Sequence, residues 1–192
     1  MSKAVMLSIR PKWCEKVASG EKTIEVRKTR PKLKTPFKAY IYCTMPDAKN
    51  PHNILELHGA DGKIRKANGK VIGEFTCDRI DRLAPANDPY GIYDIGDDYV
   101  LQTCLENGAL WDYGHGTPLY GWHISDLRIY DAPKKLGEFW RDCLEYSELS
   151  TNCWSCENVC GDGDETDCNT DGRLYLRRPP QSWCYVEAKK DE

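Results

Sequence analysis

The chain of 192 residues lacks an apolar run near the ~18 residues that a membrane-spanning helix needs. Residues 1–7 contain too short an apolar stretch for a secretory signal peptide. The sequence has no internal repeat either, which argues against a solenoid. We therefore expect residues 1–192 to form one soluble, cytoplasmic domain with no membrane partner.

Cysteine, in contrast, is abundant, with ten residues in the chain. Because there is no export signal, a disulfide framework is not expected, and metal binding better explains any clustered cysteines. Cys14, Cys43, Cys77 and Cys104 are scattered among apolar residues. We interpret these four as small buried core residues.

The remaining cysteines include a cluster with regular spacing, Cys153-x2-Cys156-x3-Cys160-x7-Cys168. Its opening CxxC knuckle lets two thiolates converge on one metal ion. Cys168 is the expected third ligand, with Cys143 or Cys160 as the fourth. Four sulfur ligands in a tetrahedral array suit structural zinc, the one cofactor that we predict.

The cluster lies in a polar, acidic stretch, and we interpret residues 144–176 as an insert within the domain. A zinc site would order a segment that has no apolar core of its own. Three alternatives remain: an iron–sulfur cluster, a redox pair of Cys153 and Cys156, and an insert with free thiols. The acidic insert is also where a protein partner would bind if the protein were an adaptor.

Charge is unevenly distributed, although the net charge is only −3. Residues 1–40 hold eleven Lys and Arg against three Glu, whereas residues 141–171 hold nine acids against Arg141. A basic N-terminal part in an acidic protein favours a local site for a phosphate, a nucleotide or a nucleic acid. A solvated basic face is the alternative.

Hydrophobic periodicity predicts an α+β chain. Five or six strands separated by variable excursions favour a small closed barrel over a doubly wound sheet. Strands are expected at residues 4–9, 23–27, 39–44, 70–78, 127–130 and 183–188. Helices are expected from Pro11 to Gly20, from Asp97 to Glu106 with Gly108 as its stop signal, and from Pro133 to about residue 143. Residues 28–38 should be an exposed loop and residues 46–68 a long excursion.

The most informative stretch is Gly20-Glu21-Lys22-Thr23-Ile24-Glu25-Val26-Arg27. Strand alternation places its two aliphatic residues on the core face, and Glu25 and Arg27 on the opposite face. Arg27 offers a planar fork for a phosphate or a carboxylate. Burial of Lys22 would lower its pKa toward that of a general base. From the spacing alone, a structural Glu25–Arg27 pair beside an exposed Lys22 is the alternative.

This stretch resembles the Gly-x-Lys-x-x-Glu-x-Arg signature of ASCH domains, which belong to the PUA-like superfamily of small β-barrels that handle RNA and nucleotides. The strand at residues 5–9, the helix from Pro11 and the segment 70–75 also stand where that family has them. Residues 178–187 resemble the end of a phage- and bacteria-associated subgroup. The resemblance implies a PUA-like α+β fold, a small mixed β-barrel with flanking helices and a Cys-rich insert.

The resemblance also implies a function, the binding of RNA or of a modified nucleoside or nucleotide in a cleft. Its residues would be Lys22, Glu25, Arg27, Arg30 from the basic loop, and Trp122 as a stacking surface. Packing in the core is the alternative role for Trp122. No organic cofactor is expected.

A hydrolase in the same cleft is the alternative function, acting on acylated cytidine or on RNA with Lys22 and Glu25 as catalytic residues. Some small ASCH proteins are amidohydrolases of this kind and have a threonine at the position that matches Glu25. The glutamate in this chain removes that hydroxyl and adds a charge. The motif therefore supports binding better than it supports catalysis.

The cysteine cluster leads to a direct prediction. Protein purified without a chelator should carry close to one zinc per chain, because four thiolates form a closed site. Metal analysis by mass spectrometry measures this ratio. A value below ~0.3 zinc per chain would contradict the zinc assignment.

Overall fold

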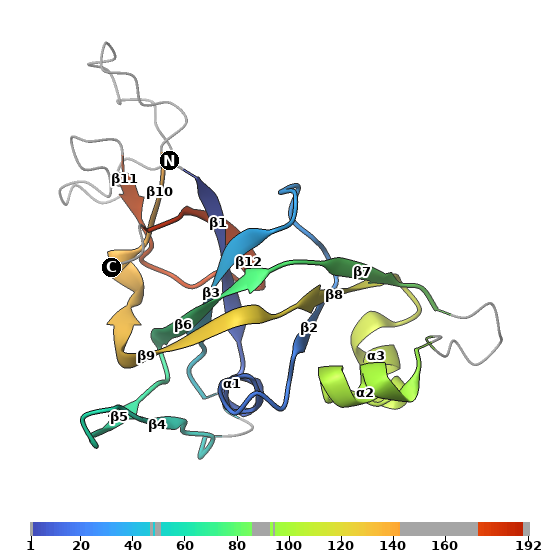
Figure 1. The fold of residues 1–192 in the computed structure, drawn as a ribbon, viewed down its shortest axis with the longest axis horizontal. Helices are drawn as coiled ribbons and strands as arrows, with labels where there is room; N and C mark the ends of the chain where they lie inside the picture. The colour runs from blue at the N-terminus through green and yellow to red at the C-terminus, as the bar shows by residue number, and fades with distance from the viewer. Residues whose placement is uncertain are drawn as a thin grey trace, which may run out of the picture.

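The computed structural model describes residues 2–46, 48, 51–85, 93, 95–142 and 173–189. Within these residues the chain forms an α+β fold in which strands predominate (Figure 1). None of the described helices is long and apolar enough to cross a membrane. The predicted zinc ligands Cys143, Cys153, Cys156, Cys160 and Cys168 lie outside the described residues. The described part itself contains no group of three His, Cys, Asp or Glu that could hold a metal ion.

A five-stranded mixed sheet with the order β12-β1-β3-β6-β9 forms the centre of the molecule. Strands β1 and β3 are parallel, and the other neighbours are antiparallel. The five strands are β1 (Lys3–Ile9), β3 (Phe37–Cys43), β6 (Lys70–Cys77), β9 (Ser125–Lys135) and β12 (Trp183–Glu187). The fold class predicted from the sequence, a mixed α+β domain with flanking helices, is confirmed.

A three-stranded antiparallel sheet, β2-β8-β7, lies beside the central sheet, and two short hairpins complete the strands. The three strands are β2 (Ile24–Arg27), β7 (Ile80–Leu83) and β8 (Leu119–His123). The hairpins pair β4 (Glu56–His58) with β5 (Ile64–Lys66), and β10 (Trp140–Asp142) with β11 (Arg173–Tyr175).

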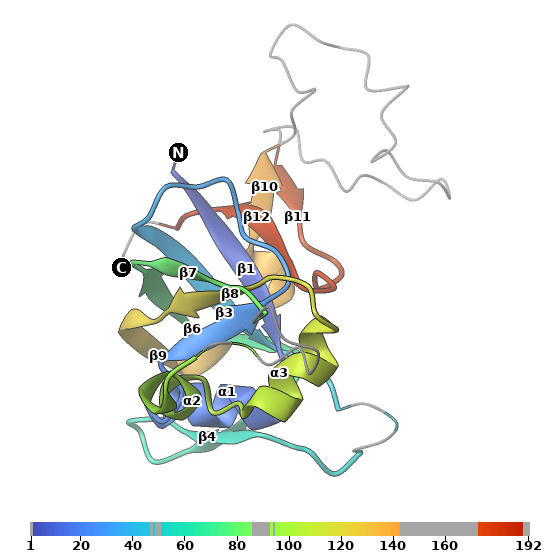
Figure 2. The same ribbon diagram turned by 90° about the vertical axis from the view of Figure 1, so that its right-hand side faces the viewer.

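Three helices lie in the lower half of both views, where β4 also lies (Figures 1 and 2). They are α1 (Pro11–Ala18), α2 (Asp97–Thr103) and α3 (Asn107–Gly114), and a short 3-10 helix, η1 (Leu136–Glu138), follows β9. Pro11 at the first helical position and Gly20 at positive φ just after α1 are the start and stop signals that the sequence predicted.

The main core lies where the central sheet packs against α1 and β8. Val5, Ile41 and Phe75 of the sheet share it with Val17 of α1 and Trp122 of β8. A side chain from the three-stranded sheet in this cluster shows that both sheets enclose one core.

Cysteine placement agrees with the prediction at three of four positions. Cys14, Cys43 and Cys77 are buried, and burial raises the pKa of the Cys77 thiol to about 12. Cys104 was predicted to be a core residue as well, but it is only partly buried. It adopts a left-handed conformation at the end of α2.

Two predicted helices are wrong in whole or in part. The helix expected from Pro133 is a strand, because Pro133 lies within β9 at the edge of the sheet. The pairing register between β9 and β6 shifts near Pro133. The N–H that proline lacks therefore leaves no gap in a regular row of hydrogen bonds between the strands. The helix expected from Asp97 to Glu106 ends at Thr103, and Gly108, its expected stop signal, lies in the first turn of a second helix, α3.

Two glycines allow the packing of α2 to be tested. A Cβ at Gly121 of β8 would overlap the Tyr99 hydroxyl of α2, whereas a Cβ at Gly108 meets nothing within 4 Å. Gly121→Ala should therefore lower the free energy of unfolding by about 1–3 kcal/mol. Gly108→Ala should raise it by about 0.5–1 kcal/mol, because alanine favours a helix. Urea denaturation measures both values, and effects of the same sign would contradict this packing.

Candidate functional site

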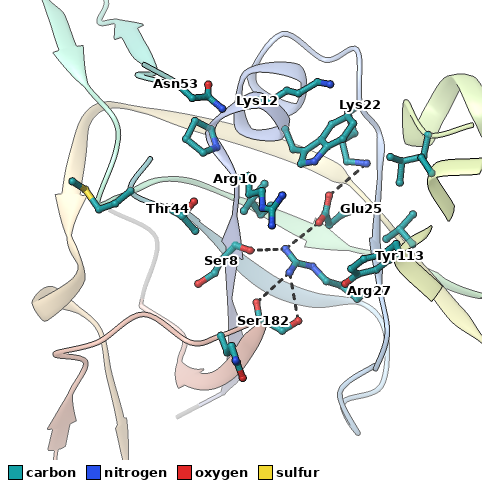
Figure 3. Close-up of a pocket in the computed structure, with 18 of the residues that line it drawn as sticks. Ser8, Arg10, Lys12, Lys22, Glu25, Arg27, Thr44, Asn53, Tyr113 and Ser182 are labelled. Carbon is teal, nitrogen blue, oxygen red and sulfur yellow. Dashed lines mark hydrogen bonds and ion pairs between the residues drawn. The ribbon is translucent and has the colours of Figure 1, made fainter. Parts of the chain in front are cut away.

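A cavity of about 750 Å³ opens where the end of β1, the start of α1, β2 and α3 meet (Figure 3). The segments that follow β3 and precede β12 complete its walls. The three motif residues Lys22, Glu25 and Arg27 all line this cavity. The structure therefore brings together the residues that the sequence singled out.

Glu25 joins the two cations of the motif. Its Oε1 lies 3.0 Å from Arg27 Nη2, and its Oε2 lies 3.5 Å from Lys22 Nζ. All three side chains are more than nine-tenths buried. One carboxylate thus compensates two cations, and the buried group retains a net positive charge beneath the cavity.

Lys22 is the most buried of the three, with 2% of its surface exposed. Its Nζ donates a hydrogen bond of 2.6 Å to the carbonyl oxygen of Thr103, the last residue of α2. The ammonium also lies 5.2 Å from the centre of the Trp13 ring. A helix carboxyl end and an aromatic face both favour a cation. Burial nevertheless lowers the pKa of Lys22, and the charge of Glu25 partly offsets that shift.

Arg27 links β2 to β1 and to the segment before β12. Its Nη2 donates to the carbonyl oxygen of Ser8 in β1 at 2.8 Å. Its Nη1 lies 3.4 Å from both the carbonyl oxygen and the hydroxyl of Ser182, the residue before β12. The Nε of Arg27 is buried and has no hydrogen-bond partner within the described chain.

Strand alternation predicted the position of β2 and placed Glu25 and Arg27 together on one face. That face is not open to solvent. All four residues of β2 are buried, because both faces of the strand are covered. Val26 packs with Leu110 of α3 and Leu119 of β8. Glu25 and Arg27 face the cavity between β1 and α1 instead of open water.

The other two predicted ligand residues lie elsewhere. Trp122 does not line the cavity and is fully buried, with its ring edge-on to Phe37 at 5.8 Å, so its alternative role in the core is confirmed. Arg30 is exposed on the loop after β2, and its guanidinium lies 5.8 Å from the centre of the Tyr120 ring.

Four further residues of the cavity wall were missed. Arg10 and Lys12 are exposed cations at the start of α1, and Trp13 of the same helix and Tyr113 of α3 contribute aromatic rings. Pro11 marks a helix start in the sequence, which could have pointed to its two basic neighbours. Tyr113 lies in a Gly-rich segment whose aromatics the sequence offers for stacking, but α3, which places it in the wall, was not predicted.

The cavity wall is strongly cationic. Four of the described residues that line it are basic, Arg10, Lys12, Lys22 and Arg27, and Glu25 is the single acid. The arrangement favours an anion with a planar apolar part, since basic and aromatic side chains face the same space.

The comparison with solved structures supports the fold. The crystal structure of an ASCH protein from Zymomonas mobilis matches 96% of this chain and 87% of its own, with a TM-score of 0.55 and 16% identity. The chain has the ASCH fold. Two variants of that protein, each 19% identical with a TM-score of 0.49, cover 70% and 69% of this chain and 77% and 74% of their own. No family model and no curated protein matches the chain.

At this identity the ASCH fold is shown and the activity is not. The motif that carried the resemblance nevertheless lies in a single cavity of that fold. Because one fold can host many activities, the function depends on the chemistry of the cavity wall.

The buried ion pairs allow a test of how the site is held. Glu25→Gln removes the charge between Lys22 and Arg27 and should lower the free energy of unfolding by about 3–5 kcal/mol. Asp61→Asn is the control, because Asp61 pairs with Arg65 at the surface at 2.6 Å and should matter far less. Thermal and urea denaturation compare the two variants, and equal effects would contradict a buried triad.

Proposed function

We propose that this ASCH-fold protein binds RNA, or a modified nucleoside or nucleotide, in the cavity lined by Lys22, Glu25 and Arg27. One observation carries the proposal: a cavity of about 750 Å³ has four cations and one carboxylate in its wall. Small-molecule sites are typically about 300–1,000 Å³, so a nucleotide fits this space. The likeness of the fold to an ASCH structure supports the proposal.

The parts of a nucleotide match different regions of the wall. Arg10 and Lys12 are exposed at the entrance and suit the phosphate, which must stay partly hydrated. Trp13 and Tyr113 provide faces on which a base can stack. The Arg27 guanidinium and the Glu25 carboxylate line the cavity and are the buried groups that would meet the polar edge of a base or a ribose.

Hydrolysis in the same cavity is less favoured than binding. A general base must reach the proton that it abstracts, so its basic atom should not already be engaged by another group. Glu25 is paired with Arg27 at 3.0 Å, and Lys22 donates to the Thr103 carbonyl at 2.6 Å. The lowered pKa of Lys22 is the feature that a hydrolase would use. Because the charges hold one another, we propose binding as the function.

The entrance cations provide the test. Replacing both Arg10 and Lys12 by glutamate should weaken the binding of a labelled RNA oligonucleotide at least about tenfold, because two phosphate contacts are lost. The slope of log affinity against log salt should also fall by about 0.7 for each lost contact. Fluorescence anisotropy across a salt series measures both.

Arg82→Glu is the matched control, because Arg82 is exposed on β7 and lies outside the cavity wall. This variant should bind like the natural protein. RNA binding that does not respond to salt, or an equal loss with Arg82→Glu, would contradict binding at the cavity.

A further inference from the structure

A second hollow, of about 680 Å³, lies away from the cavity and is lined by lysines. The four lysines are Lys3 of β1, Lys34 of the loop before β3, Lys38 of β3, and Lys189 after β12. No acidic residue of the described chain is part of this lining. Four cations from three separate segments in one hollow suit a polyanion.

Two of these lysines pair with acids that are not part of the lining. Lys38 Nζ lies 3.4 Å from Glu74, and Lys189 Nζ lies 4.0 Å from Glu138 and 4.4 Å from the centre of the Phe139 ring. These contacts position the two ammonium groups. Lys3 and Lys34 are exposed, so the hollow retains cations that face solvent.

The hollow and the cavity lie at opposite ends of the same three strands. β12, β1 and β3 are neighbours in the central sheet (Figure 1). The β1 strand begins at the hollow with Lys3 and reaches the cavity at Ser8 and Ile9. Six steps of roughly 3.3 Å separate the ends of this strand by about 20 Å.

The basic loop at residues 28–36 spans this distance. It leaves β2 at the cavity and enters β3 at the hollow. Two hydrogen bonds fasten it along β12: Trp183 Nε1 donates to the Thr29 hydroxyl at 2.9 Å, and the Lys32 N–H donates to the Tyr185 hydroxyl at 2.8 Å. Both contacts follow the chain order of β12, so the loop runs beside that strand from the cavity to the hollow.

The loop carries a cation at every second position, namely Lys28, Arg30, Lys32 and Lys34, and all four are exposed. No acidic residue occurs between Arg27 and Lys38. Lys28 Nζ lies 5.1 Å from the centre of the Tyr113 ring, which belongs to the cavity wall. The row of positive charge thus begins at the cavity and ends at the lysines of the hollow.

We propose that the ligand of the cavity is one nucleotide within a single strand of RNA, and that the strand continues along this loop to the lysine hollow. The inference rests on the proposed function, because the cavity anchors one end of the strand. A nucleoside-sized cavity needs an unpaired base, which favours a single strand over a duplex. At about 3.4 Å for each stacked nucleotide, the 20 Å track holds roughly six nucleotides.

The test is a length series of labelled oligouridylates of two to twelve nucleotides, measured by fluorescence anisotropy. Affinity should rise with length up to about six to eight nucleotides and then level off. The double variant Lys32→Glu/Lys34→Glu should bind an eight-nucleotide RNA about tenfold less tightly and reduce its salt slope by about 1.4. Its affinity for the dinucleotide should stay unchanged. The hydrogen bond to Tyr185 comes from the backbone of Lys32, so this substitution leaves it in place.

The matched control is Lys63→Glu/Lys66→Glu, which reverses two exposed cations of the β4–β5 hairpin, away from the track (Figure 1). It should bind every length like the natural protein. Affinity that does not depend on length, or a loop variant that binds the long RNA normally, would overturn the track.

The failure of the track can be separated from the failure of the cavity proposal. If the entrance variant Arg10→Glu/Lys12→Glu loses dinucleotide and long RNA alike while the loop variant loses neither, the cavity proposal stands and the track does not. If the entrance variant binds both RNAs normally, the cavity proposal itself fails. A polyglutamate peptide of equal charge that competes as well as the RNA would overturn the assignment to RNA.

Discussion

The placement of one carboxylate between two buried cations is the constraint on which the rest of the site depends. Glu25 compensates Lys22 and Arg27 in a place where an isolated charge would be strongly destabilising. The two cations then reach outward, Lys22 to the end of α2 and Arg27 to β1 and to the segment before β12. A single charged group therefore ties three parts of the fold to β2.

This arrangement explains how a structural ion-pair group can also form the wall of a cationic cavity. Because one acid cannot neutralise two cations, a net positive charge remains beneath the cavity, and Arg10 and Lys12 add to it at the entrance. Burial keeps water from screening that charge, so an anion in the cavity would interact with it more strongly than at an open surface. The outer cations line the cavity and are not part of the core, so their replacement tests the proposed binding with little effect on stability.

The sequence predicted those elements whose signals are local. β1, α1, β2, β3, β6 and β12 were found close to their observed bounds, because alternation, Pro11 and Gly20 mark them. The errors occur where the tertiary context overrides a local signal. Pro133 is tolerated in a strand because β9 lies at the sheet edge. Gly108 lies in the first turn of α3, because α2 already ends at Cys104. Trp122 lies in the core because β8 belongs to the second sheet.

By itself the sequence determined that this chain forms an α+β domain with a charged motif on its second strand, since periodicity and short-range spacing carry that information. Only the tertiary structure decided that Lys22, Glu25 and Arg27 are buried together, because the groups that cover them come from α2, β1 and the segment before β12. Likewise, only the tertiary structure places Tyr113 in the cavity wall and the basic loop beside β12. Such placements depend on contacts between residues far apart in the chain, which no local pattern records.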